Sequence, residues 1–255
     1  MKKEMIFALA ALFFMTLSIT GVYAGENNSK WKTLSKNSMD VTGDGKDDLI
    51  EIRGIPYEEG QQFLKEIQLR ISASNGQEYK TELDGGYNPQ VQFVDLNHDN
   101  VKDMYVSIDT GGSGGISNHY LYTLKDFKIT DLTVPDPLVI NGQFHNGYKV
   151  SITIQETGKS VTFDLRNRGM DYEKSGLFIN GKLSEPTELM VDGYSSLKPV
   201  IFNGENFGLT GVQAISGAYH ADWIANVVST WMYENGKWIL KDTKIMEGKR
   251  KKNRH

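Results

Sequence analysis

The chain has 255 residues, contains no cysteine and carries a formal net charge of −4. Without cysteine, neither disulfides nor thiolate metal sites can stabilise the fold. Because basic residues are concentrated in the segment 249–254, the body of the chain is more acidic than the total charge indicates. An acidic body argues against nucleic acid as a partner and favours cations.

Residues 1–24 have the layout of a secretory signal peptide. Lys2 and Lys3 precede an apolar run over residues 5–19, and Ala24 ends a short stretch suited to cleavage. The apolar run is short for a span across the bilayer. We therefore expect export of a protein that is secreted or held at the cell envelope, with no transmembrane span after cleavage. The alternative is an uncleaved membrane anchor.

The remainder is predicted to be all-β. Runs rich in β-branched and aromatic residues alternate with Asn-Gly pairs, which favour type I′ turns because both residues tolerate positive φ. Such pairs begin at Asn75, Asn141, Asn146, Asn180 and Asn235, and a further one begins at Asn203. We expect antiparallel, blade-like units that form a partial or small β-propeller-like structure. A β domain is expected over residues 25–135, and a C-terminal β-rich region over 136–247 either continues it or forms a separate unit.

Two nine-residue acidic loops carry the strongest chemical signal. They run from Asp40 to Asp48 and from Asp95 to Asp103, with an acid at positions 1, 5 and 9 of each. A strand-like apolar run follows each loop, and Val106 stands where an EF-hand would have its twelfth-position Glu. The loops are therefore not EF-hands. His98, at position 4 of the second loop, is expected to face solvent.

The spacing of oxygen-bearing side chains predicts that each loop binds calcium. Calcium takes six to eight oxygen ligands at about 2.3–2.6 Å, and alternate side chains in a loop wound around a point converge on that point. Position 7 would contribute its backbone carbonyl, so that a Lys and a Val are both tolerated there. The first ligand set is Asp40, Thr42, Asp44, Lys46 and Asp48, and the second is Asp95, Asn97, Asp99, Val101 and Asp103.

The segments Asp40-Val-Thr-Gly-Asp-Gly-Lys-Asp-Asp-Leu-Ile and Phe93-Val-Asp-Leu-Asn-His-Asp-Asn-Val-Lys-Asp resemble the FG-GAP or VCBS-type repeats of bacterial exported proteins. Those repeats are related to the calcium loops of integrin α-chain propellers. The resemblance implies calcium held by the side chains at positions 1, 3, 5 and 9 of each loop. Thr42 departs from the usual Asp or Asn, and two copies are too few for a complete propeller ring.

Plain Asp/Asn/Gly turns between strands are the alternative interpretation of these loops. Two copies in matching register favour calcium, because acids crowded into nine residues repel one another without a cation. We therefore expect a calcium-stabilised exported protein with a structural or binding role and no assigned catalytic residue. Its partners besides calcium would be an envelope polymer or another envelope protein.

A secreted hydrolase acting on wall polymer or peptide is the alternative function. Asp109 begins an Asp-Thr-Gly triplet before a glycine-rich stretch, His119 follows it, and His220 with Asp222 could form a second polar site. An aspartic-protease site needs two such triplets, and the chain has one. A hydrolase would require a pocket in which Asp109, His119 or His220 converges with another acid. The basic residues 248–255 are expected to be a disordered end or a tether to anionic polymer or lipid.

Overall fold

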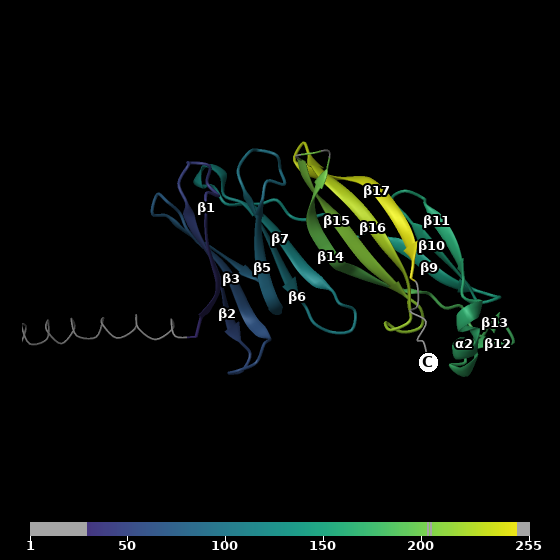
Figure 1. Cartoon of the computed structure of the whole chain (residues 1–255). Helices are drawn as coiled ribbons and strands as arrows, with labels where there is room; N and C mark the ends of the chain where they lie inside the picture. Colours follow the sequence, from purple (N-terminus) through teal and green to yellow (C-terminus); the bar gives the residue numbers. More distant parts are fainter. Residues whose placement is uncertain (1–29, 203, 205, 249–255) are drawn as a thin grey trace, which may run out of the picture.

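The structure, a computed structural model, describes residues 30–202, 204 and 206–248. The predicted signal peptide over residues 1–24 and the basic residues beyond Gly248 lie outside this range. Almost all regular structure in the described residues is antiparallel β-sheet (Figure 1), which confirms the all-β prediction. In the same part of the chain, no helix is long and apolar enough to span a bilayer.

The first sheet (sheet I) is a four-stranded meander in which each strand pairs with the next along the chain. Its strands are β1 (Lys32–Met39), β2 (Asp48–Pro56), β3 (Leu64–Ser72) and β4 (Glu78–Leu83). β2 shows why this segment is a strand. Ile50 and Ile52 are buried, whereas Glu51 and Arg53 lie on the opposite, partly exposed face, so the strand covers a core with one side only.

The second sheet (sheet II) repeats the same meander. Its strands are β5 (Tyr87–Val94), β6 (Asp103–Asp109), β7 (Ser117–Thr123) and the short β8 (Thr130–Asp131), and the 3-10 turn η1 (Lys125–Phe127) precedes β8. In both sheets an acidic loop connects the first strand to the second. The spacing between the two loops is therefore the spacing between two copies of one sheet unit.

The C-terminal half contributes two further sheets. Sheet III has the strand order β11-β10-β9, and sheet IV is a meander of four long strands. The strand bounds are β9 (Ile140–His145), β10 (Lys149–Ile154), β11 (Ser160–Asp164), β14 (Met190–Phe202), β15 (Asn206–Ser216), β16 (Trp223–Glu234) and β17 (Lys237–Glu247). Between the two sheets lie the 3-10 turn η2 (Arg166–Arg168), helix α2 (Gly169–Lys174) and the hairpin of β12 (Phe178–Ile179) and β13 (Lys182–Leu183).

The four sheets are stacked in a row in the order I, II, IV, III, so the last sheet in the sequence lies between the second and the third (Figure 1). Each neighbouring pair of sheets shares a buried apolar cluster. Representative members are Ile52 and Val106 between sheets I and II, Leu121 and Leu197 between II and IV, and Ile152 and Val227 between III and IV. Burial of these apolar surfaces is the main stabilising contribution in a chain without disulfides.

The Asn-Gly turns are only partly as predicted. Asn180-Gly181 and Asn235-Gly236 have positive φ at both residues, as a type I′ turn requires. In the pairs at 75–76 and 146–147 only the glycine has positive φ, so these turns differ in form. The prediction is wrong for Asn141-Gly142, which lies inside β9. A Cβ on Gly142 would lie 2.8 Å from the Leu189 side chain, so glycine allows a neighbouring segment to approach.

Candidate functional site

The two acidic loops have the same backbone shape. In each loop the residues at positions 4 and 6 have positive φ: 79° and 80° at Gly43 and Gly45, and 60° and 67° at His98 and Asn100. This conformation is most easily adopted by glycine and asparagine, which accounts for the residues at position 6. The loops are two copies of one folded unit, although their sequences differ at most positions.

The acid at position 9 is the buried centre of each loop. Asp48 and Asp103 are 1% and 0% exposed. In both loops its Oδ2 accepts the backbone N–H groups of positions 2 and 3, at 2.9 and 3.1 Å in the first loop and at 2.8 and 3.2 Å in the second. This carboxylate ties the start of the loop to the start of the following strand.

The acids at positions 1 and 5 are held by N–H groups of their own loops. Asp40 accepts N–H bonds from positions 4 and 6 at 2.7 and 2.9 Å, and Asp95 accepts them from positions 5 and 6 at 3.1 and 2.9 Å. Asp44 and Asp99 each accept the N–H of position 7 at 2.9 Å. These bonds fix the bend of each loop, as Asx turns do.

Positions 3 and 7 supply the neutral groups of the predicted ligand sets. Thr42 is buried, and its hydroxyl lies 3.4 Å from Oδ1 of Asp40. Asn97 donates to Oδ2 of Asp99 at 3.1 Å. At position 7, Lys46 is exposed whereas Val101 is buried, which is compatible with a position that contributes a backbone carbonyl.

In the first loop, both carboxylate oxygens of the acids at positions 1, 5 and 9 accept hydrogen bonds from the protein. Ser74, in the turn between β3 and β4, donates its backbone N–H to Oδ1 of Asp48 at 2.8 Å and its hydroxyl to Oδ2 of Asp44 at 2.7 Å. The hydroxyl bond from Ser74, followed by the backbone N–H of Lys46, lowers the pKa of Asp44. The loop and the turn between β3 and β4 thus supply hydrogen bonds to both oxygens of the buried Asp48 carboxylate.

The second loop leaves one buried carboxylate oxygen unbonded. Oδ1 of Asp103 has no hydrogen-bond partner of normal geometry among the described residues. Burial raises the pKa of Asp103 to about 6, although N–H bonds from Leu96 and Asn97 and the nearby Thr123 hydroxyl act in the opposite direction. Lys125 is the cation beside this loop: its ammonium donates to the backbone oxygen of Asp99 at 2.8 Å and lies 3.6 Å from Oδ2 of the same residue.

No three His, Cys, Asp or Glu side chains in the described ranges gather closely enough to hold a metal ion by themselves. Calcium sites mix carboxylates with neutral oxygens, and each loop offers both kinds. The residues present therefore fit calcium in their chemistry, and Oδ1 of Asp103 is a buried oxygen that could ligate a cation.

The two loops pack against each other. A Cβ on Gly43 would lie 2.8 Å from a methyl group of Val101, so position 4 of the first loop touches position 7 of the second. η1 bridges both loops, because the N–H of Asp126 donates to the backbone oxygen of Thr42 at 3.0 Å while the neighbouring Lys125 contacts the second loop. The loops form one structural unit.

The second loop also contacts sheet IV. Nε2 of His98 lies 2.8 Å from the backbone oxygen of Phe207 in β15. The expectation that His98 faces solvent is therefore wrong. The loop holds this residue with positive φ, and that places its ring against the neighbouring sheet instead.

Two of the candidate hydrolase residues share a cleft. Asp109 and His119 both line a cavity of about 230 Å³ between sheet II and β14. Asp109 accepts a hydrogen bond from the Ser117 hydroxyl at 2.9 Å. His119 Nδ1 lies 2.8 Å from the Tyr105 hydroxyl, and burial lowers the pKa of His119 to about 4. This imidazole is therefore uncharged at neutral pH.

His220 is not part of that cleft. Its Nδ1 lies 3.1 Å from Oδ2 of Asp192. The expectation that Asp222 accompanies it is wrong, because the buried carboxylate of Asp222 pairs with Arg168 at 2.7 Å and with the Tyr172 hydroxyl at 2.8 Å. Asp109 and His119 thus share one cleft, whereas His220 lies apart beside Asp192. No local sequence signal indicated Asp192, Arg168 or Tyr172 as partners.

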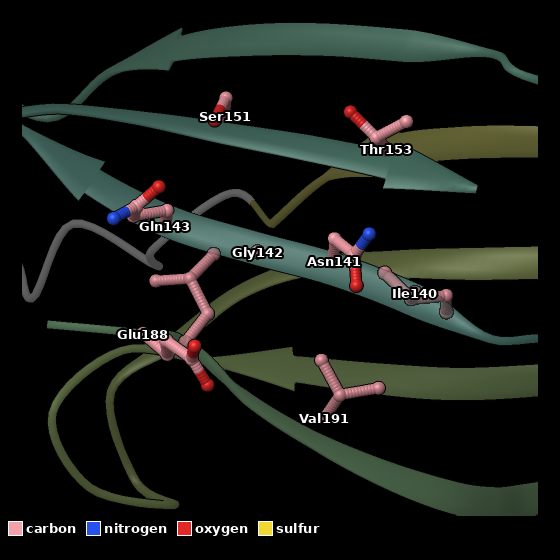
Figure 2. Close-up of a pocket in the computed structure, with 9 residues that line it drawn as sticks. Ile140, Asn141, Gly142, Gln143, Ser151, Thr153, Glu188 and Val191 are labelled. Carbon is pink, nitrogen blue, oxygen red and sulfur yellow. The ribbon is translucent and has the colours of Figure 1, made fainter. Parts of the chain in front are cut away.

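A wider pocket of about 640 Å³ lies beside sheet III (Figure 2). Asn141 and Gln143 of β9 and Ser151 and Thr153 of β10 point toward it, and the segment 188–191 forms its other side. Its polar lining is mainly amide and hydroxyl groups. None of the residues predicted from the sequence lies in this pocket.

Comparison with known proteins identifies the family of this chain. A family model for the YybI C-terminal domain matches residues 138–246, the part of the chain that contains sheets III and IV. The crystal structure of the exotype rhamnogalacturonan lyase YesX aligns with 84% of this chain at 14% identity, but its TM-score is 0.36 and the chain spans only 33% of that protein. The uncharacterized protein YybI of Bacillus subtilis (strain 168) is 30% identical over 209 residues, which cover 79% of each chain. The chain therefore belongs to the YybI family.

Proposed function

We propose that this protein is an exported, calcium-stabilised β protein with a structural or binding role at the cell envelope or in the secreted milieu. Its calcium ligands are the residues at positions 1, 3, 5, 7 and 9 of each acidic loop, in the manner of FG-GAP or VCBS-type repeats. The single observation that carries the proposal is Oδ1 of Asp103, a carboxylate oxygen that is buried and unbonded at position 9 of a loop rich in oxygen ligands.

The electrostatics of the second loop favour a cation. Burying an ionised carboxylate is costly unless its oxygens are paired, and burial raises the pKa of Asp103 in spite of the N–H bonds that its Oδ2 accepts. Lys125 reaches Asp99, at the outer side of the loop, and its ammonium is a hydrogen-bond donor to the backbone there. A calcium ion at Oδ1 of Asp103 would compensate the buried charge at its source.

The position of the loops indicates what calcium would do. The second loop contacts the first loop through Val101 and sheet IV through His98. An ion that stiffens this loop would therefore stabilise the stacking of three sheets. A structural role of this kind is typical of calcium in modules that meet the millimolar calcium outside cells.

Thermal unfolding with and without calcium tests the proposal. At ten times the dissociation constant, one site adds about 1.4 kcal/mol to the free energy of unfolding, which corresponds to a rise of about 3–6 °C in Tm for a chain of this size. EDTA should reverse the rise, and the double substitution Asp44→Ala and Asp99→Ala should abolish it.

Asp47→Ala is the matched control. Asp47 is an exposed acid at position 8 of the first loop, where its carboxylate accepts a bond from the Ser38 hydroxyl and is not among the proposed ligands. This variant should keep the full response to calcium. A wild-type Tm that does not change between EDTA and about 10 mM calcium would refute the proposal, as would an equal loss of response in Asp47→Ala.

A further inference from the structure

The two faces of sheet II are built differently. On the face toward sheet I, β6 presents Met104, Val106 and Ile108, all buried in one apolar cluster. On the opposite face the same strand presents Tyr105 in the cluster shared with sheet IV, and then Ser107 and Asp109. The contact with sheet IV is therefore apolar at one end and polar at the other.

The polar end is a cleft with two walls. One wall is a cross-strand row of sheet II, in which Gln90 pairs with Ser107 and Ser107 with His119. The other wall is the segment 195–198 of β14. The complete lining is Asn88, Gln90, Gln92, Tyr105, Ser107, Asp109, Ser117, His119, Ser195, Ser196, Leu197 and Lys198. A cleft between two separately built sheets is a common place for a ligand.

The hydrogen bonds of Tyr105 fix the tautomer of His119. The Tyr105 hydroxyl contacts both the backbone oxygen of Leu197 and Nδ1 of His119. A carbonyl oxygen can only accept, so the single hydroxyl proton is donated to Leu197. Nδ1 must then carry the imidazole proton and donate it to the Tyr105 oxygen. In the neutral ring, Nε2 is left as a bare acceptor.

Among the residues that the structure describes, this acceptor has no hydrogen-bond partner. Nε2 of His119 is buried and makes no hydrogen bond to any described residue. Leaving a buried acceptor unsatisfied typically costs about 1–3 kcal/mol. An apolar side chain at this position would avoid that cost and would extend the apolar contact with sheet IV. A histidine at this position is explained if a bound ligand donates a hydrogen bond to Nε2.

We propose that this cleft binds a small, uncharged, hydroxyl-rich ligand of about the size of one sugar residue. The lining is dominated by amides and hydroxyls, which both donate and accept as vicinal hydroxyl groups do. The lining has one anionic side chain, Asp109, and one cationic side chain, Lys198, so neither charge is in excess. A charged ligand would call for a concentration of opposite charge. The volume of about 230 Å³ lies below the range of drug-sized pockets.

In the complex, a ligand hydroxyl donates to Nε2 of His119, and other hydroxyls exchange hydrogen bonds with the amides and serines of the row. Nε2 is closed to solvent in the free protein, so binding includes a small displacement of neighbouring side chains. The inference deepens the binding role proposed above, but it uses none of the calcium-loop residues. Binding is therefore measured in saturating calcium and again in EDTA, so that a failed cleft and a failed calcium site give different results.

Nitrogen-15 NMR of the histidine rings provides the test. In the free protein we expect His119 to carry its proton on Nδ1 and to show an unprotonated Nε2. Titration with the neutral probes glucose and N-acetylglucosamine, up to about 50 mM for a weak millimolar interaction, should shift the Nε2 resonance. Glucuronate, glucosamine and glycylglycine are the charged and zwitterionic comparisons, and they should bind more weakly.

Two serine variants localise the site. Ser107→Val places a methyl group in the middle of the row and should weaken binding of the neutral probe at least tenfold, because neighbouring polar groups lose their partner. Ser151→Val makes the same change at mid-strand in sheet III, beside the other pocket, and should leave binding unchanged. Circular dichroism and Tm verify that both variants are folded.

The inference would be overturned by a proton on Nε2 of His119 in the free protein, by the absence of a response to either neutral sugar, or by equal effects of the two serine variants. Stronger binding of a charged probe would also overturn it, because the ligand class would then be wrong.

Discussion

The two acidic loops share one backbone but differ in what surrounds their carboxylates. In the first loop, Ser74 completes the hydrogen bonding of Asp48 and Asp44. In the second loop, Oδ1 of Asp103 remains unbonded, and Lys125 lies beside Asp99 instead. The same fold unit is thus self-sufficient in one copy and electrostatically incomplete in the other. The difference indicates that the second loop gains more from a cation.

The largest expected effect comes from exchanging the central acid for its amide. In EDTA, Asp48→Asn should lower the free energy of unfolding by about 3 kcal/mol. Both oxygens of Asp48 accept backbone N–H groups, so the amide NH₂ must face a donor in either orientation. Asp103→Asn can turn its NH₂ toward the unbonded side and should cost less than about 1 kcal/mol. Urea unfolding of the two variants measures the difference, and equal losses would show that the loops are equivalent.

The pH dependence of stability is the second way to separate the loops. The folded pKa of Asp103 is about 6 against an ordinary value of 3.8, so the folded state binds more protons than the unfolded state between these values. In EDTA, this carboxyl should therefore reduce the free energy of unfolding as the pH rises from about 4 to 6, by up to about 3 kcal/mol.

Comparison with Asp103→Asn isolates this contribution. His119, whose pKa is lowered to about 4, acts in the opposite direction, because the unfolded state then binds more protons as the pH falls below the ordinary value for histidine. It is present in both proteins, so it cancels in their difference. Urea unfolding at a series of pH values should show that the wild type loses stability relative to Asp103→Asn as the pH rises from about 4 to 6. A constant difference in the free energy of unfolding would contradict the prediction.

The smallest expected effect concerns the lysine beside the second loop. Lys125→Met removes the ammonium group from Asp99 and should lower stability in EDTA by less than about 1 kcal/mol. Since a competing positive charge has gone, calcium affinity should rise about threefold. Calorimetric titration measures this change. Lys102→Met, at the exposed position 8 of the same loop, is the control, and an equal rise in that variant would assign the effect to net charge alone.

The sequence was most informative where the interacting residues are contiguous. Each acidic loop contains nearly all of its own hydrogen-bonding groups within nine residues, and the strand pattern on both sides is local. The bend at Gly45 and Asn100 follows from the residue types at position 6, whereas the burial of Asp48 and Asp103 is seen in the structure alone. What could not be predicted is the role of Ser74, because it reaches the first loop from a different turn.

The other features that were predicted wrongly or missed depend on contacts between residues far apart in the sequence. Asn141-Gly142 has the composition of a turn, but pairing with β10 and the close approach of Leu189 keep it in a strand. His220 and Asp222 are near in sequence, yet Asp222 is drawn into a buried ion pair with Arg168. The cleft at His119 depends on strands whose residues are far apart in the chain, and no spacing rule identifies it.

The stacking order of the sheets has a consequence for how the chain matures. Sheet IV is synthesised last, yet it fills the space between sheets II and III (Figure 1). Until β14 to β17 have assembled, the apolar surfaces around Leu121 and Ile152 lack the sheet that covers them. Such late, long-range closure is slow and leaves a partly folded chain prone to aggregation. Premature termination anywhere after sheet III would therefore yield an aggregation-prone product rather than a shorter functional protein.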